Sequence, residues 1–268
     1  GAWGGIHICG RAHTNAEGGK GSSEIGGAVY GGNDDADNSG TLQYIRLEYT
    51  GFAFDEEHEA NGISFYGVGN GTIVDHCQAY KGSDDGFEFF GGSVNVSNLV
   101  AVSCSDDSFD WTEGWNGKGT NLVAYQEAES TLGYDCDCLM ECDNNGSNNA
   151  ATPVAHPVLK NLILVGNGGS KQGIRLRAGT EVEIDNAKVC GKGQPLTVET
   201  ALTENALKNG TSKLTNITLT SELSSKEGIY THADFIAVTS NKVDANLSYS
   251  SFEDIRKECS WMNGSWGK

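Results

Sequence analysis

Short stretches in which apolar and polar residues alternate recur along the chain, separated by clusters of Gly, Asn and Asp. Residues 87–89 read Phe-Glu-Phe, residues 109–111 read Phe-Asp-Trp, and residues 174–177 read Ile-Arg-Leu-Arg. A period of two predicts β-strands whose apolar side chains face a core and whose charged side chains face outward. No stretch has the spacing of a long amphipathic helix, so the pattern predicts an all-β protein.

The alternating stretches also repeat along the sequence. The segment Ser83–Phe89 returns as Ser105–Trp111, and looser copies lie at 61–67 and 172–179. A single short coil cannot bury its inward side chains, whereas coils stacked at roughly 4.8 Å share a continuous core. We therefore predict a right-handed, single-stranded parallel β-helix with about 22 residues per coil.

We expect residues 1–268 to form one domain, with a less regular C-terminal part at 194–268. Residues 199–207 predict a short helix, and residues 251–261 predict another that caps an open end of the β-helix. The start of the chain has no such cap. We expect upstream coils or a neighbouring molecule to cover that end.

The charge balance restricts the kinds of partner. The chain has 18 Lys and Arg against 36 Asp and Glu, a net charge of −18. Nucleic-acid binding needs a basic footprint, so this composition argues against it and favours divalent cations. No apolar run is long enough to span a membrane.

Two features point to an oxidising, extracellular compartment. The number of cysteines is even and no C-x-x-C pair occurs, which favours disulfides, although a metal–thiolate site at residues 136–142 remains the rival interpretation. The cysteines are Cys9, Cys77, Cys104, Cys136, Cys138, Cys142, Cys190 and Cys259. N-x-[ST] sequons, which accept glycans if the protein is eukaryotic, begin at Asn70, Asn95, Asn145, Asn209, Asn216, Asn246 and Asn263.

Several motifs that occur in a fixed order over roughly residues 1–190 resemble those of a known protein family. They are the run at 30–49 (YGGNDDADNSGTLQYIRLEY), SDDGFEFFGG at 83–92, DDSFD at 106–110 and GIRLRAGT at 173–180. In these motifs the chain resembles a large family of secreted and surface-anchored β-helix proteins with a pectate-lyase-like fold. The resemblance implies a right-handed parallel β-helix and an extracellular location, and it implies no particular activity.

Acidic residues gather in the repeated segments. If one repeat forms one coil, Asp84 lies over Asp106 and Asp85 lies over Asp107. Three interpretations compete: turn structure, a calcium site, or acid–base catalysis on a polysaccharide, as in hydrolases and lyases of this fold. The catalytic candidates are Asp84, Asp85, Asp106, Asp107 and Arg175.

A second acidic loop lies at 33–40. Its aspartates follow the start of an EF-hand pattern, but Arg46 stands where that pattern requires Glu, so it is not an EF-hand. We still count it as an ion-binding candidate. The complete set of metal-ligand candidates is Asp34, Asp35, Asp37, Asp84, Asp85, Asp106, Asp107 and Asp110.

The sequence thus predicts an extracellular structural or adhesive module, stabilised by Ca²⁺ and disulfides, without an organic cofactor, and part of a larger surface assembly or filament. The alternative is a protein that binds or degrades polysaccharides. Aromatic side chains that point outward stack on sugar rings, and the candidates are Tyr66, Phe90, Trp115 and Trp261.

Overall fold

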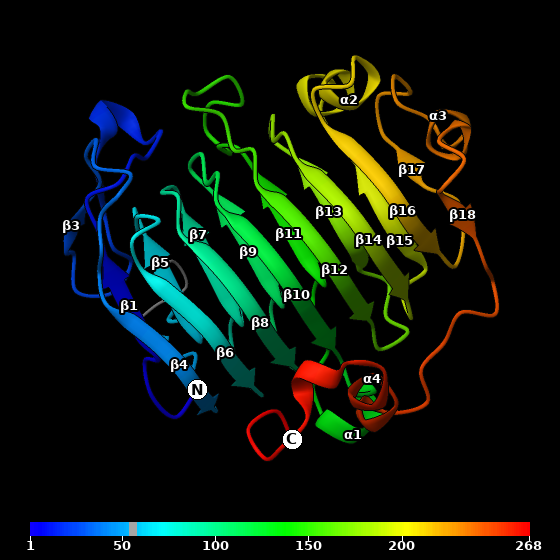
Figure 1. Cartoon of the computed structure of the whole chain (residues 1–268), viewed down its shortest axis with the longest axis horizontal. Helices are drawn as coiled ribbons and strands as arrows, with labels where there is room; N and C mark the ends of the chain where they lie inside the picture. The colour runs from blue at the N-terminus through cyan, green and yellow to red at the C-terminus, as the bar shows by residue number, and fades with distance from the viewer. Residues whose placement is uncertain (54–57) are drawn as a thin grey trace.

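The computed structural model describes residues 1–53 and 58–268, which form a right-handed parallel β-helix (Figure 1). Each regular coil contributes one short strand to a first sheet and one longer strand to a second. In spatial order, sheet 1 contains β1 (Ile6–Cys9), β5 (Ile63–Tyr66), β7 (Phe87–Phe90), β9 (Phe109–Thr112), β11 (Met140–Asp143), β13 (Gln172–Arg177), β15 (Gln194–Val198) and β17 (Ser224–Ser225). Sheet 2 contains β4 (Thr41–Glu48), β6 (Ile73–Tyr80), β8 (Asn95–Val102), β10 (Lys118–Tyr125), β12 (Val158–Val165), β14 (Glu183–Cys190), β16 (Lys213–Leu219) and β18 (Lys242–Val243).

The remaining elements are short. Strands β2 (Gly21–Ser22) and β3 (Val29–Tyr30) form an antiparallel pair. The helices are η1 (Glu17–Gly19), α1 (Glu129–Leu132), α2 (Ala201–Lys208), α3 (His232–Ala237), α4 (Phe252–Glu258) and η2 (Ser260–Met262). No helix in the described ranges has the length and hydropathy needed to cross a membrane.

The alternation of residues in sheet 1 places its side chains as predicted. The aromatic residues at 87, 89, 109 and 111 are at most 2 % exposed, and so are Ile174 and Leu176. Equivalent rings stack between coils, with centroids 5.0 Å apart for Phe65 and Phe89 and 5.6 Å apart for Phe87 and Phe109. One hydrophobic core therefore runs along the interior of the coils.

The coils are less uniform than the repeat predicts. Hydrogen bonds between neighbouring coils show this difference. The bond between Asp85 and Asp107 joins residues 22 positions apart in the sequence, whereas the bond between Asn121 and Asn161 joins residues 40 positions apart. The strands pair in parallel and in register in both places, because the additional residues lie in the connections between strands. The repeat length of 22 residues is thus the length of the shortest coils in the described part of the chain, and longer coils contain insertions between their strands.

Each long strand of sheet 2 bends at a residue in the left-handed conformation. Asparagine tolerates this conformation better than most residues, and its side chain occupies the bend in successive coils. Asn121 donates a hydrogen bond to Asn98 over 2.8 Å, Asn161 donates to Asn121 over 3.1 Å, and Asn186 donates to Asn161 over 2.9 Å. The bend positions have φ between 53° and 66° and are Tyr44, His76, Asn98, Asn121, Asn161, Asn186 and Asn216.

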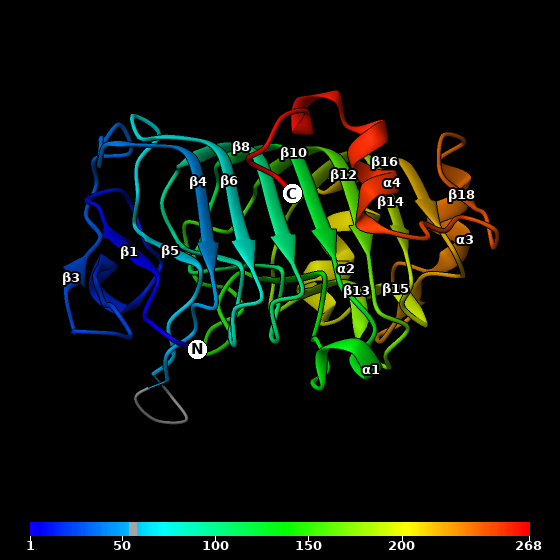
Figure 2. The same ribbon diagram turned by 90° about the horizontal axis from the view of Figure 1, so that it is seen from below.

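The C-terminal helix does not cap an end of the β-helix, which corrects the expectation for residues 251–261. Helix α4 and η2 lie across the outside of sheet 2 (Figure 2). There, outward-facing Val100, Val123 and Ile163 pack against Ile255 and Met262. These strands are apolar on both faces and need a cover outside as well as inside. At the C-terminal end of the core, Phe235 of α3 is fully buried instead.

A buried carboxylate organises the turn before α3. Glu204 of α2 is 0 % exposed and accepts hydrogen bonds from the backbone N–H groups of Glu227, Ile229 and Tyr230 over 2.6–3.0 Å. The Ser225 hydroxyl donates another over 2.8 Å. Burial alone would raise the pKa of Glu204, but these donors outweigh it and hold the pKa below its ordinary value.

We expect Glu204→Gln to lower the free energy of unfolding by about 2 kcal/mol at neutral pH, because charge-assisted hydrogen bonds in a buried site are lost. In the unmodified protein the pKa of this carboxyl is lower folded than unfolded. Its contribution is therefore complete above the unfolded pKa and is lost as pH falls through the folded pKa. Urea unfolding at pH 7 and at pH 3–5 measures both effects.

Glu222→Gln is the matched control, since Glu222 is exposed and lies in the same region of the chain. We expect its stability to be close to that of the unmodified protein. Equal losses in the two variants would show that the Glu204 carboxylate does not anchor this turn.

Candidate functional site

The outer face of sheet 1 carries a groove whose lining is almost entirely acidic. Its volume is about 410 Å³, and ten of its twelve described lining residues are carboxylates. The lining residues are Glu24, Glu59, Asn61, Asp84, Asp85, Glu88, Asp106, Asp107, Asp110, Asp137, Glu141 and Arg175. The charge of this groove is concentrated over the middle coils of the β-helix.

Parallel register stacks the outward residues of sheet 1 into a row. Ser64 pairs with Glu88, Glu88 with Asp110, Asp110 with Glu141, and Glu141 with Arg175. Adjacent members of such a row lie about 5 Å apart. The row therefore brings three carboxylates together before the first positive charge.

A second row runs along the turns that precede these strands. Asp85 accepts a hydrogen bond from the backbone N–H of Asp107 over 2.8 Å, and Asp107 accepts one from the backbone N–H of Cys138 over 2.6 Å. Both aspartates are 5 % exposed. Each thus tethers its own turn to the next coil, as the turn-structure interpretation predicts, and keeps one oxygen outside these two hydrogen bonds.

Several carboxylates approach closely enough to share a cation. One candidate ligand atom from each of Asp85, Glu88 and Asp110 lies within 4.8 Å of the others. The same holds for Asp84, Asp85 and Asp106, and for Asp106, Asp107 and Asp137. The Oδ1 atom of Asp110 is buried without a hydrogen-bond partner among the described residues.

Burial and mutual repulsion disfavour the charged forms of these groups. Burial, followed by repulsion from Glu59 and Asp106, raises the pKa of Asp84 to about 7. Burial also raises the pKa of Asp85, Glu88, Asp107 and Asp110 well above the usual range, and neighbouring carboxylates add to the effect. Without a cation, the groove therefore retains protons that isolated carboxyls would lose.

Positive charge is confined to the edge of the groove. Arg175 bonds Glu141 over 2.9 Å and both carboxylate oxygens of Glu199 over 3.2 Å. Arg177 bonds Glu141 over 2.5 Å, and Lys171 bonds Asp137 over 2.6 Å. These pairs neutralise the later coils, while the carboxylates at positions 85 and 110 form no ion pair within the described part of the chain.

The donor set fits a hard divalent cation. Ca²⁺ takes six to eight oxygen ligands and tolerates irregular geometry, and the carboxylate groups around Asp85 and Asp106 supply such oxygens. The unpartnered Oδ1 of Asp110 is the atom that such an ion would satisfy. A fourth group contains Cys138 with Asp107 and Glu141, but its soft sulfur ligand suits Ca²⁺ less well.

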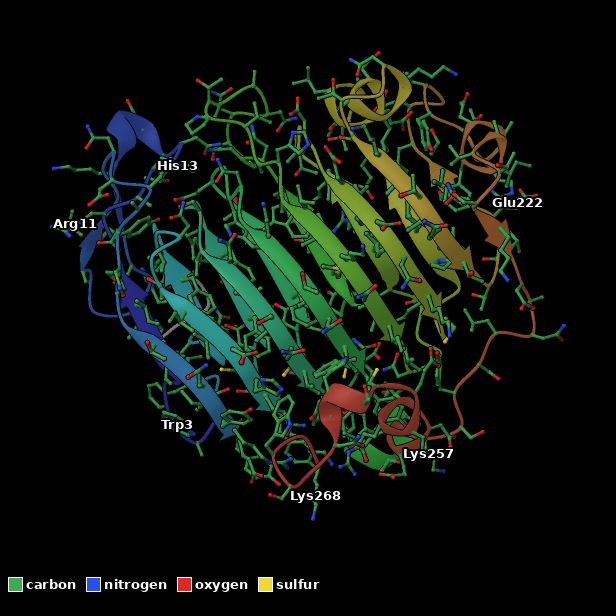
Figure 3. All side chains as sticks on the ribbon, viewed as in Figure 1. Trp3, Arg11, His13, Glu222, Lys257 and Lys268 are labelled. Carbon is green, nitrogen blue, oxygen red and sulfur yellow. The ribbon has the colours of Figure 1, made fainter. Side chains whose placement is uncertain are left out.

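The acidic loop at 33–40 lies elsewhere, at the N-terminal end of the β-helix. Asp35 accepts hydrogen bonds from the ring and backbone nitrogens of His13 over 2.7 and 3.1 Å. Asp37 accepts one from Arg11 over 3.1 Å, and Asp34 lies 3.9 Å from the same guanidinium. Arg11 and His13 mark this end in Figure 3. The loop aspartates thus face basic groups and do not join the groove.

The eight cysteines are unbonded in the structure, which shows none of the disulfides that the sequence predicted. Cys77 on β6 and Cys142 on β11 illustrate one reason, because two strands of sheet 2, β8 and β10, separate their coils. Three strand spacings amount to about 14 Å, and a disulfide requires Cα atoms within about 7 Å. Seven cysteines are buried and Cys9 is half-buried. Cys77, Cys104 and Cys142 lie in the core inside the coils, whereas Cys190 and Cys259 belong to one cluster between sheet 2 and α4.

The other sequence candidates divide by exposure. Six of the seven sequon asparagines are exposed, and Asn145 is half-buried with its amide bonded to Asn15 over 3.0 Å. Three of the four aromatic candidates, Tyr66, Phe90 and Trp115, are at most 8 % exposed and serve packing. Trp261 is half-buried, so it is the one aromatic candidate of the four with appreciable exposed surface.

Five acidic lining residues are absent from the candidates that the sequence provided: Glu24, Glu59, Glu88, Asp137 and Glu141. Glu141 pairs with Asp110, and the backbone N–H of Asp137 donates to the carbonyl of Asp106, but a long connection displaces both residues from the sequence repeat. Residues 140–143 alternate between apolar and acidic residues, with Glu141 between Met140 and Cys142, and this alternation could have identified Glu141 as an outward-facing residue. Glu24 and Glu59 come from irregular segments without any repeat signal.

We expect the free energy of unfolding to fall as pH rises from 5 to 8 when a chelator is present. The groove carboxyls at positions 84, 85, 88, 107 and 110 have a higher pKa folded than unfolded, so the folded state binds more protons. Each additional proton contributes a slope of roughly 1.4 kcal/mol per pH unit. Urea unfolding across this range measures the slope. Asp110→Asn should flatten it, whereas a flat profile in the unmodified protein would contradict the electrostatic description of the groove.

Comparisons with known proteins agree with the architecture. A search of curated proteins and a search of solved structures each returned no match. A family model described as a pectate-lyase-like β-helix domain matches residues 1–268. With parallel coils, a continuous core and a groove on sheet 1 in place, the chain belongs to the family of pectate-lyase-like β-helix domains.

Proposed function

We propose that this chain is an extracellular adhesion module that binds Ca²⁺ in the groove of sheet 1 and holds an acidic polysaccharide there. The observation that carries the proposal is the groove itself, in which ten carboxylates face one Arg and one Asn. A module of this kind would act within a larger surface assembly. No organic cofactor is needed.

Calcium is the first part of the proposal. Carboxylates within 4.8 Å of one another repel strongly in a partly buried site unless a cation lies between them. A shared divalent ion would remove this repulsion and satisfy Asp110 Oδ1. It would also leave coordination positions on the ion open to oxygens of a second ligand, because Ca²⁺ accepts up to eight ligands.

Acidic polysaccharide is the second part. The stacked coils repeat at roughly 4.8 Å, a length close to that of one pyranose unit in an extended chain. The groove crosses the coils from β5 to β13, so successive sugar units can meet equivalent positions. A uronate carboxylate would approach the bound ions, and sugar hydroxyls would donate hydrogen bonds to the remaining carboxylates.

Hydrolysis of the polysaccharide is the second candidate function. It is favoured by Asp84, whose pKa of about 7 suits a general acid at neutral pH. The convergence of three carboxylates, with ligand atoms within 4.8 Å of one another, favours ion binding instead, since a hydrolase uses a pair that stands about 6.5–9.5 Å apart in inverting enzymes and about 5–5.5 Å apart in retaining ones. A lyase base at Arg175 is disfavoured, because two glutamates hold its guanidinium.

Calcium should raise the melting temperature of the chelator-treated protein, because an ion that binds only the folded state stabilises it. Isothermal titration should show that Asp110→Asn weakens binding by about tenfold, roughly 1.4 kcal/mol. Asp254→Asn, on α4 and outside the groove, is the matched control and should bind as the unmodified protein does. A melting temperature indifferent to calcium would refute this part of the proposal.

Polygalacturonate and alginate immobilised in a gel should retard the protein when calcium is present and release it with chelator. Asp110→Asn should lose most of the retardation, whereas Asp254→Asn should keep it. Release of new reducing ends, abolished by Asp84→Asn, would establish the hydrolase instead. Retardation that survives both chelator and Asp110→Asn would contradict the role of the groove.

A further inference from the structure

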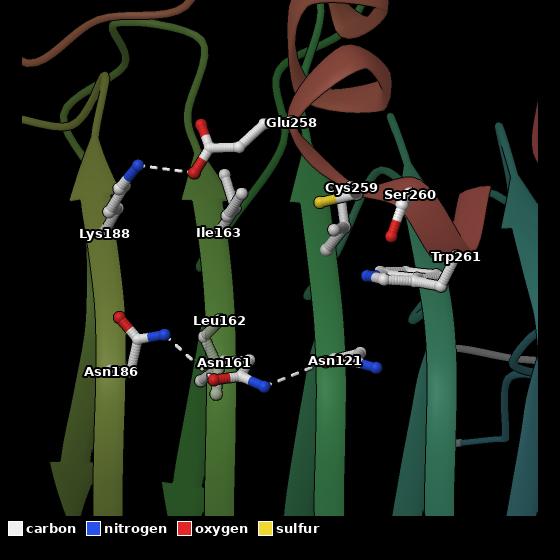
Figure 4. Close-up of a pocket in the computed structure, with 11 residues that line it drawn as sticks. Asn121, Asn161, Leu162, Ile163, Asn186, Lys188, Glu258, Cys259, Ser260 and Trp261 are labelled. Carbon is white, nitrogen blue, oxygen red and sulfur yellow. Dashed lines mark hydrogen bonds and ion pairs between the residues drawn. The ribbon is translucent and has the colours of Figure 1, made fainter. Parts of the chain in front are cut away.

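A second cavity lies on the outer face of sheet 2, beneath the C-terminal segment. Its volume is about 300 Å³, and strands β10, β12 and β14 form its floor (Figure 4). Residues 258–261, at the junction of α4 and η2, form its roof. It shares no lining residue with the carboxylate groove. From its composition we propose that this cavity binds a neutral sugar, such as a terminal hexose or N-acetylhexosamine unit of a glycan.

The floor offers a row of amides with unused hydrogen-bonding capacity. An asparagine amide has two N–H donors and an oxygen with two lone pairs. Within the row, Asn121 and Asn161 each donate one hydrogen bond and accept one, and Asn186 donates one. Each therefore keeps an N–H that bonds none of the residues described by the structure, and the oxygen of Asn186 accepts no hydrogen bond from them either. Adjacent donors and acceptors of this kind match vicinal hydroxyl groups.

The walls and roof supply the apolar part of the site. Val123 and Ile163 face outward from adjacent strands in register. Figure 4 shows the Trp261 indole beside Cys259 at the roof. The indole lies at the end of the amide row beyond Asn121, away from Asn186, and it also contacts Trp266 with ring centroids 6.0 Å apart. A ligand that meets both the ring and Asn186 would therefore span two sugar units, one of which packs its C–H face on the ring while the other places its hydroxyls on the amides.

The charged residues of the cavity favour a neutral ligand. Lys188 donates to Glu258 over 2.5 Å, and the second oxygen of Glu258 accepts from Tyr249 over 2.7 Å. The only two charged lining residues in the described cavity therefore neutralise each other. An acidic or basic ligand would find no unpaired counter-charge, whereas hydroxyls can share the edges of this ion pair.

The size of the cavity restricts the ligand further. A volume of about 300 Å³ is at the lower limit for ligand pockets. The cavity can therefore hold one or two sugar units, which is why we assign it a terminal sugar of a glycan and not a long chain.

The row of asparagines has a structural role at the strand bends, so its test needs a variant that preserves the bend. Asn186→Gly keeps access to the left-handed conformation while it removes the side-chain amide and its hydrogen bond to Asn161. Asn216→Gly is the matched control, because Asn216 occupies the same position in the next coil, has φ of 55° and lies outside the cavity. Trp261→Ala removes the ring, and Trp261→Phe retains a smaller aromatic face.

The experiment is an NMR titration of the whole chain with methyl glycosides of neutral monosaccharides and disaccharides, built from hexoses, deoxyhexoses, pentoses and N-acetylhexosamines, and with a methyl uronide. Chelator is present throughout, so that calcium-dependent binding in the groove of sheet 1 does not contribute. The Trp261 indole N–H signal and the side-chain amide signals of Asn161 and Asn186 report on the cavity. We expect at least one neutral glycoside to shift these signals in a saturable manner.

Trp261→Ala and Asn186→Gly should weaken that binding by at least about tenfold, the effect of losing a stacking contact or buried hydrogen bonds. Trp261→Phe and Asn216→Gly should retain most of it. Melting temperatures identify any variant that has lost its fold. The proposal is overturned if no neutral glycoside shifts these signals, if the uronide binds more tightly, or if Asn216→Gly is as defective as Asn186→Gly.

Discussion

Parallel pairing of successive coils at one strand spacing is the constraint on which the rest of the molecule depends. It places residues with the same position in the coil directly above one another, whatever their chemistry. Inside, this stacks Phe65 on Phe89 and Phe87 on Phe109, which favours a continuous core. On the outer face of sheet 1 it stacks Glu88, Asp110 and Glu141, which is unfavourable unless protons or cations compensate the charge.

The two sheets use this stacking in different ways. The outer face of sheet 1 concentrates charge that its own side chains neutralise only at the edge, through Arg175 and Arg177. Sheet 2 instead stacks asparagine amides, which satisfy one another from coil to coil, beside an apolar surface covered by α4. The same stacking thus produces one face with clustered negative charge and another face with neutral, mutually bonded amides. The two proposed sites differ in chemistry for this reason.

The sequence allowed the fold to be predicted because alternation and repetition are local signals. The inward positions of Phe87, Phe89, Phe109 and Trp111 followed from the period of two. The stacking of Asp85 and Asp107 followed from the repeat offset, and their hydrogen bond confirms it.

Other features could not be predicted in this way because they depend on insertions or on contacts between distant segments. The long connection before β11 displaced Glu141 from the repeat, and the apolar outer face of sheet 2 brings α4 to the side of the β-helix. The cysteines, expected to form a disulfide framework, divide between the core inside the coils, which holds Cys77, Cys104 and Cys142, and the cluster beneath α4, which holds Cys190 and Cys259.

The unequal coil lengths have an evolutionary consequence. Asn121 on β10 and Asn161 on β12 have a sequence separation of 40, against 22 for Asp85 and Asp107, yet the registers in both places are undisturbed. Connections can therefore lengthen, shorten or exchange residues without any strand having to re-pair. Mutation can remodel the surroundings of a binding surface in this scaffold while the framework is inherited intact, so relatives with closely similar coils need not recognise the same ligands.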